Sequence, residues 1–219
     1  MDTEQRKHII QTLETKSLTK SHIFNITHDI FQETKNVLHE MSGEINEELN
    51  ARAIKLEYRD KGTFVAQLQV AGDMLIFSMH TNVFVFDPKH SIWENEYVKK
   101  DKFNAYCGVI NVYNFLADSF KYNRMDDEGY LITRIFINKD KSFFVEGHNT
   151  IKYGVEEFGQ HKFTEEIMID VFETIISRTI SFDLYVPPMD AVRRIIADQV
   201  NTKIENSKIE TGKRMGFDF

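Results

Sequence analysis

Residues 118–128 combine four carboxylates with two cations, and this mixture of charges could bind a charged ligand. Hard carboxylate oxygens suit a divalent cation, whereas a lysine and an arginine suit a phosphate or a carboxylate. The acids are Asp118, Asp126, Asp127 and Glu128, and the cations are Lys121 and Arg124. The competing interpretation is a solvated loop in which Arg124 pairs with a neighbouring acid, which is the commoner arrangement. The acids lack the regular spacing of a calcium loop, so no metal site is predicted.

Arg134 is a second candidate, because it lies in the apolar run Leu131–Ile137. Alternation along a strand places Arg134 on the same face as Ile132 and Phe136. An arginine buried there without a partner would cost several kcal/mol, so we expect either an outward charge or a paired one. Asn111 or Asn114 of a neighbouring strand could share its face.

His80 and Asn82 lie between two apolar runs, with His90, Tyr106 and Cys107 as potential neighbours. A histidine and a cysteine can form a nucleophilic couple, and two histidines can bind a metal, but each needs a positioned third group that the sequence does not show. A hairpin histidine and a buried structural cysteine are favoured. The candidate ligand-binding residues are therefore Lys121, Arg124, Asp126, Asp127, Arg134, His80 and Asn82, without an assigned catalytic residue, metal or cofactor.

The elements that must position these residues form a predicted antiparallel sheet between Ile54 and Val145. Alternating or continuous apolar residues bounded by turn residues predict seven strands. These are Ile54–Arg59, Phe64–Val70, Met74–Phe77, Val83–Phe86, Tyr106–Phe115, Tyr130–Asn138 and Ser142–Val145. Met74–Phe77 and Val83–Phe86 are continuously apolar, which predicts central strands covered on both faces and joined by a tight hairpin at His80–Asn82.

Helices should cover this sheet. Apolar residues at spacings of three, four and seven predict a long helix over residues 17–50, with Glu33, Lys35, Glu40 and Glu47 on its polar side. Thr164 begins a second helix that ends before Pro187, and Asp190 begins a third. Residues 87–102 and 116–129 should partly close the other face. We expect one α+β domain over residues 1–219, in which residues 1–16 form a loosely attached arm.

Composition narrows the class of protein. The net charge of −7 argues against a general nucleic-acid binder, and the single cysteine excludes an internal disulfide and fits a reducing compartment. The N-terminus lacks an apolar signal segment, and no run approaches the roughly 20 apolar residues of a membrane span. A cytoplasmic location without membrane contact is predicted.

Four segments carry a resemblance to a known family: His80–Asp87, Tyr113–Ser119, Gly129–Asn138 and Thr211–Phe217. They resemble segments of an uncharacterised family of cytoplasmic proteins from Bacteroidota. The resemblance implies a bacterial protein but no established activity, and it transfers no site residue.

Two functions remain open at this point. The first is a non-catalytic binding or assembly module, which could be homodimeric and whose surface includes residues 118–128 and Arg134. It predicts that Asp118, Asp126 and Arg134 do not line one deep cavity. The second is an enzyme or sensor acting on a phosphorylated or nucleotide-like small molecule. It would use Lys121, Arg124 and Arg134 to hold the anion, and Asp126 or Asp127 as metal ligand or base.

Overall fold

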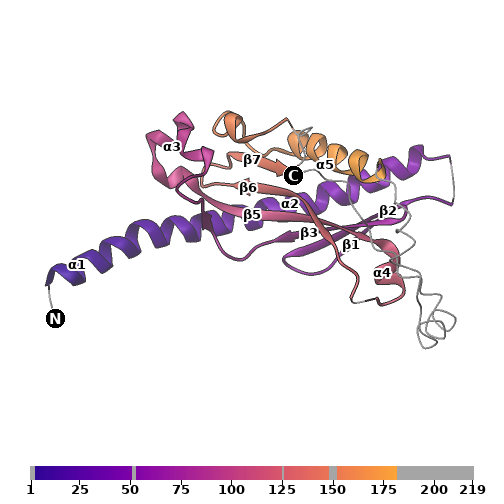
Figure 1. The fold of residues 1–219 in the computed structure, drawn as a ribbon, viewed down its shortest axis with the longest axis horizontal. Coiled ribbons are helices and arrows are strands. Elements are labelled where there is room, and N and C mark those ends of the chain that lie inside the picture. Colours follow the sequence, from indigo (N-terminus) through magenta and orange to yellow (C-terminus); the bar gives the residue numbers. More distant parts are fainter. Residues whose placement is uncertain (1–2, 51–52, 125, 148–151, 182–219) are drawn as a thin grey trace, which may run out of the picture.

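A computed structural model describes residues 3–50, 53–124, 126–147 and 152–181 of the chain. They form an α+β fold in which a long N-terminal helix and a second helix lie along an antiparallel sheet (Figure 1). This confirms the predicted fold class. The expected helix beginning at Asp190 and the docking of the chain end lie outside the described residues.

The sheet has seven strands, with the order β1-β2-β3-β5-β6-β7 and β4 paired to β5 beside β3. The strands are β1 Leu56–Asp60, β2 Val65–Val70, β3 Asp73–Met79, β4 Phe84–Val85, β5 Tyr106–Leu116, β6 Tyr130–Ile137 and β7 Phe143–Gly147. All adjacent pairs are antiparallel. Gly62 (φ 100°) permits the turn between β1 and β2, as the sequence predicted.

One face of the sheet is covered by α2 (Leu18–Glu48) and α5 (Glu165–Ile180), which pack against each other and against the strands. The main hydrophobic core lies between these two helices and the sheet, and it includes Phe31, Leu68, Phe77, Ile110 and Phe172. Every second residue of a strand points to this face. The alternation in β2 therefore predicted correctly that Ala66, Leu68 and Val70 are core residues. α2 also matches the long helix expected over residues 17–50.

The N-terminal end of this long helix extends beyond the sheet (Figure 1). It begins with α1 (Thr3–Thr12) and continues through η1 (Leu13–Ser17) into α2. None of the residues of α1 or η1 is buried, and Ile9, Ile10 and Leu13 are exposed. No helix among the described residues is long and apolar enough to cross a membrane.

The other face is covered at one end by residues 86–105 and 155–158, which enclose a second core around Cys107, Phe136, Phe144 and Phe158. The short elements here are η2 (Ser91–Glu94), α3 (Glu96–Lys100), η3 (Lys102–Ala105) and η4 (Val155–Glu157). This confirms that the expected covering segment packs on the sheet. Trp93 anchors it, with its indole N–H donating to the Asp87 carbonyl over 2.9 Å.

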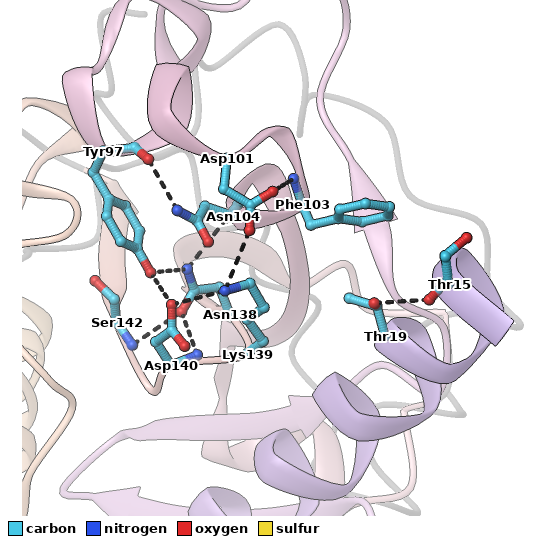
Figure 2. A network of polar contacts seen from close by, with 10 residues as sticks. All are labelled: Thr15, Thr19, Tyr97, Asp101, Phe103, Asn104, Asn138, Lys139, Asp140 and Ser142. Atoms are coloured by element: carbon cyan, nitrogen blue, oxygen red, sulfur yellow. Dashed lines mark hydrogen bonds and ion pairs between the residues drawn. The ribbon is translucent and has the colours of Figure 1, made fainter.

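A polar network joins this cover to the turn between β6 and β7 (Figure 2). The Tyr97 hydroxyl donates to Asp140 and accepts from the Asn138 amide over 3.0 Å. Asn138 also accepts from the backbone N–H groups of Asp140 and Ser142, and Lys139 pairs with Asp140 over 3.1 Å. Every polar group of Tyr97 and Asn138 is thus used to hold backbone and turn, so we interpret this network as structural.

The prediction of a central strand over Val83–Phe86 is wrong. β4 contains only Phe84 and Val85, which are 39% and 47% exposed. The hairpin predicted at His80–Asn82 is wrong as well, because β3 and β4 both run antiparallel to β5, with Met79 opposite Ile110 and Phe84 opposite Cys107. The chain therefore continues in one direction along β5, and His80–Val83 form an interruption in the strand rather than a reversal.

Lys35 is buried rather than on the polar side of the long helix. Its ammonium donates to Asp60 over 2.9 Å and to the Gly62 carbonyl over 2.6 Å, and it lies 5.6 Å from the centre of the Phe31 ring. The last residue of β1 and the turn that follows it supply these two acceptors, so the charge is buried with partners. Helical periodicity alone could not show that a polar turn would reach this position.

Candidate functional site

The polar side chains of the strands gather on the sheet face opposite α2 and α5. Directly opposed residues of antiparallel strands share a face, and one such row runs across Ser78, Asn111, Arg134 and Glu146. A second row joins Arg59, Gln67, Ile76 and Tyr113. Asn111 therefore shares a face with Arg134, whereas Asn114 lies opposite Leu75 on the helix-covered side.

A cleft of about 460 Å³ opens on this face where β4 meets the central strands. Its lining combines aromatic, aliphatic and hydrogen-bonding side chains, which are His80, Phe84, Val85, Phe86, Asp87, His90, Val109, Asn111, Tyr113, Leu131, Arg134, Phe136 and Glu146. The volume lies within the range of small-molecule sites, roughly 300–1,000 Å³.

The aromatic wall of the cleft is held by ring contacts. Phe86 packs against Phe136 with ring centres 5.0 Å apart, and Phe136 stacks on Phe144 at 4.8 Å. Phe84 meets the His80 ring edge to face at 4.7 Å. Because Phe84 is one of the exposed large apolar residues, its ring remains accessible from the cleft.

The charged groups on the floor of the cleft are paired. The Arg134 guanidinium donates to Glu146 on β7 and lies 5.4 Å from the centre of the Phe136 ring. His90 Nε2 lies 3.1 Å from the second Glu146 oxygen, while its Nδ1 accepts the Ile92 N–H over 3.1 Å. Since Nδ1 is an acceptor here, the hydrogen-bond pattern assigns the ring proton to Nε2, which donates to Glu146.

His80 has a local role in the interrupted strand. Its Nδ1 accepts the Asn82 backbone N–H over 3.0 Å, which stabilises the turn that carries the chain from β3 to β4. Asn82 itself does not line the cleft. Cys107 is fully buried, and burial raises the pKa of its thiol, so it cannot supply the thiolate that a nucleophilic couple with a histidine requires.

A second, larger groove of about 1,010 Å³ lies on the same face between β1 and α4 (Ala117–Lys121). Its lining consists of Glu57, Arg59, Lys61, Gln67, Gln69, Ala71, Gly72, Met74, Leu116, Ala117, Asp118, Phe120, Lys121 and Tyr122. Phe120 packs edge to face on Phe115 at 5.4 Å, and this contact helps to hold α4 at the end of β5.

Arg124 and Asp127 form an ion pair inside the 116–129 segment. Arg124 Nε lies 2.8 Å from Asp127, and the two side chains are only 6% and 15% exposed. Asp127 also accepts the Ser119 hydroxyl over 2.6 Å, and the Arg124 backbone N–H donates to the Ser119 carbonyl. The segment thus contains the internal ion pair that was the competing interpretation of these charges, while Asp126 is exposed.

The candidate residues from the sequence are consequently divided among three places. His80 and Arg134 line the cleft, Lys121 and Asp118 line the groove, and Arg124 and Asp127 are paired with each other. Within the described ranges, no three His, Cys, Asp or Glu side chains are placed to hold a metal ion. Sequence reasoning missed Glu146 as the partner of Arg134, and it did not single out Gln67 and Gln69 of the groove.

The fold and site together define an α+β protein whose sheet presents two separate hollows on one polar face. Comparison with protein-family models, curated proteins and solved structures finds no match to this chain. The chemistry of the two hollows is therefore what indicates a function for this protein.

Proposed function

We propose that this protein is a non-catalytic binding module that takes up a planar, uncharged, hydrogen-bonding group in the cleft between β4 and β6. The observation that carries the proposal is the pairing of Arg134 with Glu146 beneath an accessible aromatic wall. A ring entering the cleft would meet Phe84 and Phe86, and the half-buried side chains of Asn111 and Tyr113 would supply hydrogen bonds.

The charge of the cleft favours a neutral group over an anion. Its lining contains one arginine and two carboxylates, Glu146 and Asp87, so its formal charge is −1 with both histidines neutral. Arg134 is already neutralised by Glu146, and an entering anion would have to compete with that carboxylate. The alternative, an enzyme or sensor for a phosphorylated molecule, would need Lys121, Arg124 and Arg134 on one anion. Lys121 instead lines the groove, Arg134 lines the cleft, and Arg124 is paired with Asp127.

Two isosteric probes test the proposal: benzamide, which is neutral, and benzoate, which is anionic. In titrations followed by amide NMR shifts, we expect benzamide to bind more tightly than benzoate and to shift residues of β4, β5 and β6. Phe84→Ala should weaken benzamide binding about two- to tenfold, the range of one aromatic contact. Asn111→Ala should weaken benzamide more than benzene, which cannot form the hydrogen bond.

Phe120→Ala is the matched control, since Phe120 is 42% exposed and Phe84 is 39% exposed, but Phe120 lines the groove. This control should leave benzamide binding unchanged. Tighter binding of benzoate than of benzamide would instead support the anionic ligand predicted as the alternative. Equal binding by wild type and both cleft variants would refute the cleft as the site. Homodimer formation and a cytoplasmic location stay predictions from the sequence.

A further inference from the structure

The floor of the groove between β1 and α4 contains an amide without a partner. Gln67 is 9% exposed, and its side chain forms no hydrogen bond with any residue that the structure describes. Its amide atoms are not among the buried polar atoms that lack a partner, so solvent reaches them from the groove. Its neighbour on the same face, Gln69, is engaged, since its amide donates to the Ala71 carbonyl over 3.2 Å. Gln67 therefore lines the floor with an amide that is open to a ligand.

The rims of the groove carry cations on both sides. Lys61 in the turn after β1 and Lys121 at the end of α4 both line the groove and are exposed. Among the described residues, neither ammonium forms an ion pair, and Lys121 lies 5.0 Å from the centre of the Tyr122 ring. Arg59 differs, because it pairs with Glu57 on the same strand. After that pair is discounted, the lining retains two cations against the single carboxylate of Asp118.

We propose that this groove binds an extended acidic peptide segment, with the Gln67 amide pairing to a peptide group and Lys61 and Lys121 pairing to flanking carboxylates. The protein itself contains the required amide geometry. The Asn46 side chain accepts the Leu56 N–H and donates to the Leu56 carbonyl, both over 2.8 Å, so that one primary amide satisfies both polar groups of a strand residue. Gln67 can present the same donor and acceptor to an incoming chain.

The size and shape of the groove fit a chain better than a small molecule. At about 1,010 Å³ it lies at the upper end of the range for small-molecule sites, and it runs from the edge strand β1 across β2 and β3 to α4. A peptide rich in glutamate is extended by its own charge repulsion, so it loses less conformational entropy when it binds in extended form. This site is argued from its own residues and does not depend on the ring-binding cleft.

The test uses a fluorescein-labelled peptide of alternating glutamate and alanine, followed by fluorescence polarisation at low salt. We expect saturable binding that weakens as salt is added. Lys61→Gln and Lys121→Gln should each weaken binding about two- to fivefold, as expected for an exposed ion pair. Gln67→Leu should weaken it at least about fivefold, because the bound peptide group loses its partner. Gln67→Glu, which keeps the side-chain shape but repels carboxylates, should weaken it further.

Lys7→Gln is the control, because Lys7 is an exposed lysine on α1, far from the groove. It removes the same charge from the protein and should not change binding. Thermal unfolding of each variant shows whether the protein is still folded, so that weaker peptide binding can be assigned to the groove rather than to unfolding. The proposal is overturned if the glutamate peptide shows no saturable binding up to about 1 mM, if an alternating lysine peptide binds as tightly, or if folded Gln67 variants bind like wild type. None of these results bears on benzamide in the cleft.

Discussion

Replacing Glu146 by glutamine should convert the cleft from a site for neutral rings into one that accepts an anion. Glu146 bridges Arg134 and His90, and its side chain is 27% exposed, whereas that of Arg134 is 47% exposed. Glu146→Gln keeps the shape and the acceptor oxygen but removes the charge. The formal charge of the lining then changes from −1 to 0, and the Arg134 guanidinium loses its neutralising partner.

The magnitude follows from the exposure of the pair. An ion pair this open to solvent contributes at most about 1 kcal/mol to stability, so urea unfolding should show a loss no larger than that. An entering carboxylate would recover an interaction of similar size and would no longer be repelled by Glu146. We therefore expect the affinity for benzoate relative to benzamide to rise about three- to tenfold.

The assay compares benzoate with benzamide by NMR titration on wild type, Glu146→Gln and a control. Glu173→Gln is a suitable control, because Glu173 is exposed on α5 at the opposite face. The control should leave the ratio of the two affinities unchanged. An unchanged ratio in Glu146→Gln, with the protein folded, would show that Arg134 does not face the bound ring and would refute the charge argument.

Three further predictions test the packing beneath this face. Gly108→Ala should lower the free energy of unfolding in urea by about 1–3 kcal/mol, since a Cβ there would lie 2.1 Å from Thr27 Oγ1 on α2, and Thr27→Ala should recover part of the loss. The hydrogen bond from Lys35 holds the pKa of Asp60 below its ordinary value. The ionised Asp60 therefore stabilises the fold above the pKa that it has in the unfolded chain, and this stabilisation is lost as the pH falls through its pKa in the folded protein. Asp60→Asn should consequently flatten the fall of Tm below about pH 4, while an unchanged slope would contradict this pairing. Cys107 should react with Ellman's reagent only at the rate of unfolding, and rapid reaction of the native protein would contradict its burial.

The sequence predicted most of the fold because the signals in it are local. Alternation in β2 and the turn at Gly62 are fixed by residues within a few positions of one another. The apolar stripe of α2 is equally local, since its residues repeat at helical spacing along one segment. Each of these patterns specifies which side of an element is buried, which is sufficient for an α+β fold with helices on one face.

The same signals failed at Val83–Phe86, where an apolar run does not mean a central strand. Only Phe84 and Val85 pair with β5, and both are exposed because they form the rim of the cleft. A run of apolar residues indicates that water should be excluded, but it does not distinguish burial by the fold from burial by a ligand. The error therefore falls on residues that the proposed function uses.

The pairing of Arg134 with Glu146 shows what a careful use of register could have added. Alternation predicted either an outward charge or a paired one at Arg134, and the predicted strands Tyr130–Asn138 and Ser142–Val145 leave residues 139–141 as the turn between them. The observed register opposes Ile137 to Phe143 and Arg134 to Glu146, so the hairpin is symmetric about Asp140. Counting outward from the centre of that turn would have identified Glu146. The contact between His90 and Glu146 could not be found in this way, because His90 belongs to the covering segment and lies 56 residues before Glu146 in the sequence.

The 116–129 segment illustrates why residue types alone could not separate contact residues from supporting ones. Arg124 and Asp127 were both candidate ligand-binding residues, yet they form an ion pair with each other, and Asp127 accepts the hydroxyl of Ser119 on α4. The Arg124 backbone N–H also donates to the Ser119 carbonyl, so the segment after α4 is tied back onto that helix. Lys121, the last residue of α4, lines the groove. Two of the candidate residues, Arg124 and Asp127, thus support the position of a third candidate, Lys121, which lines the groove.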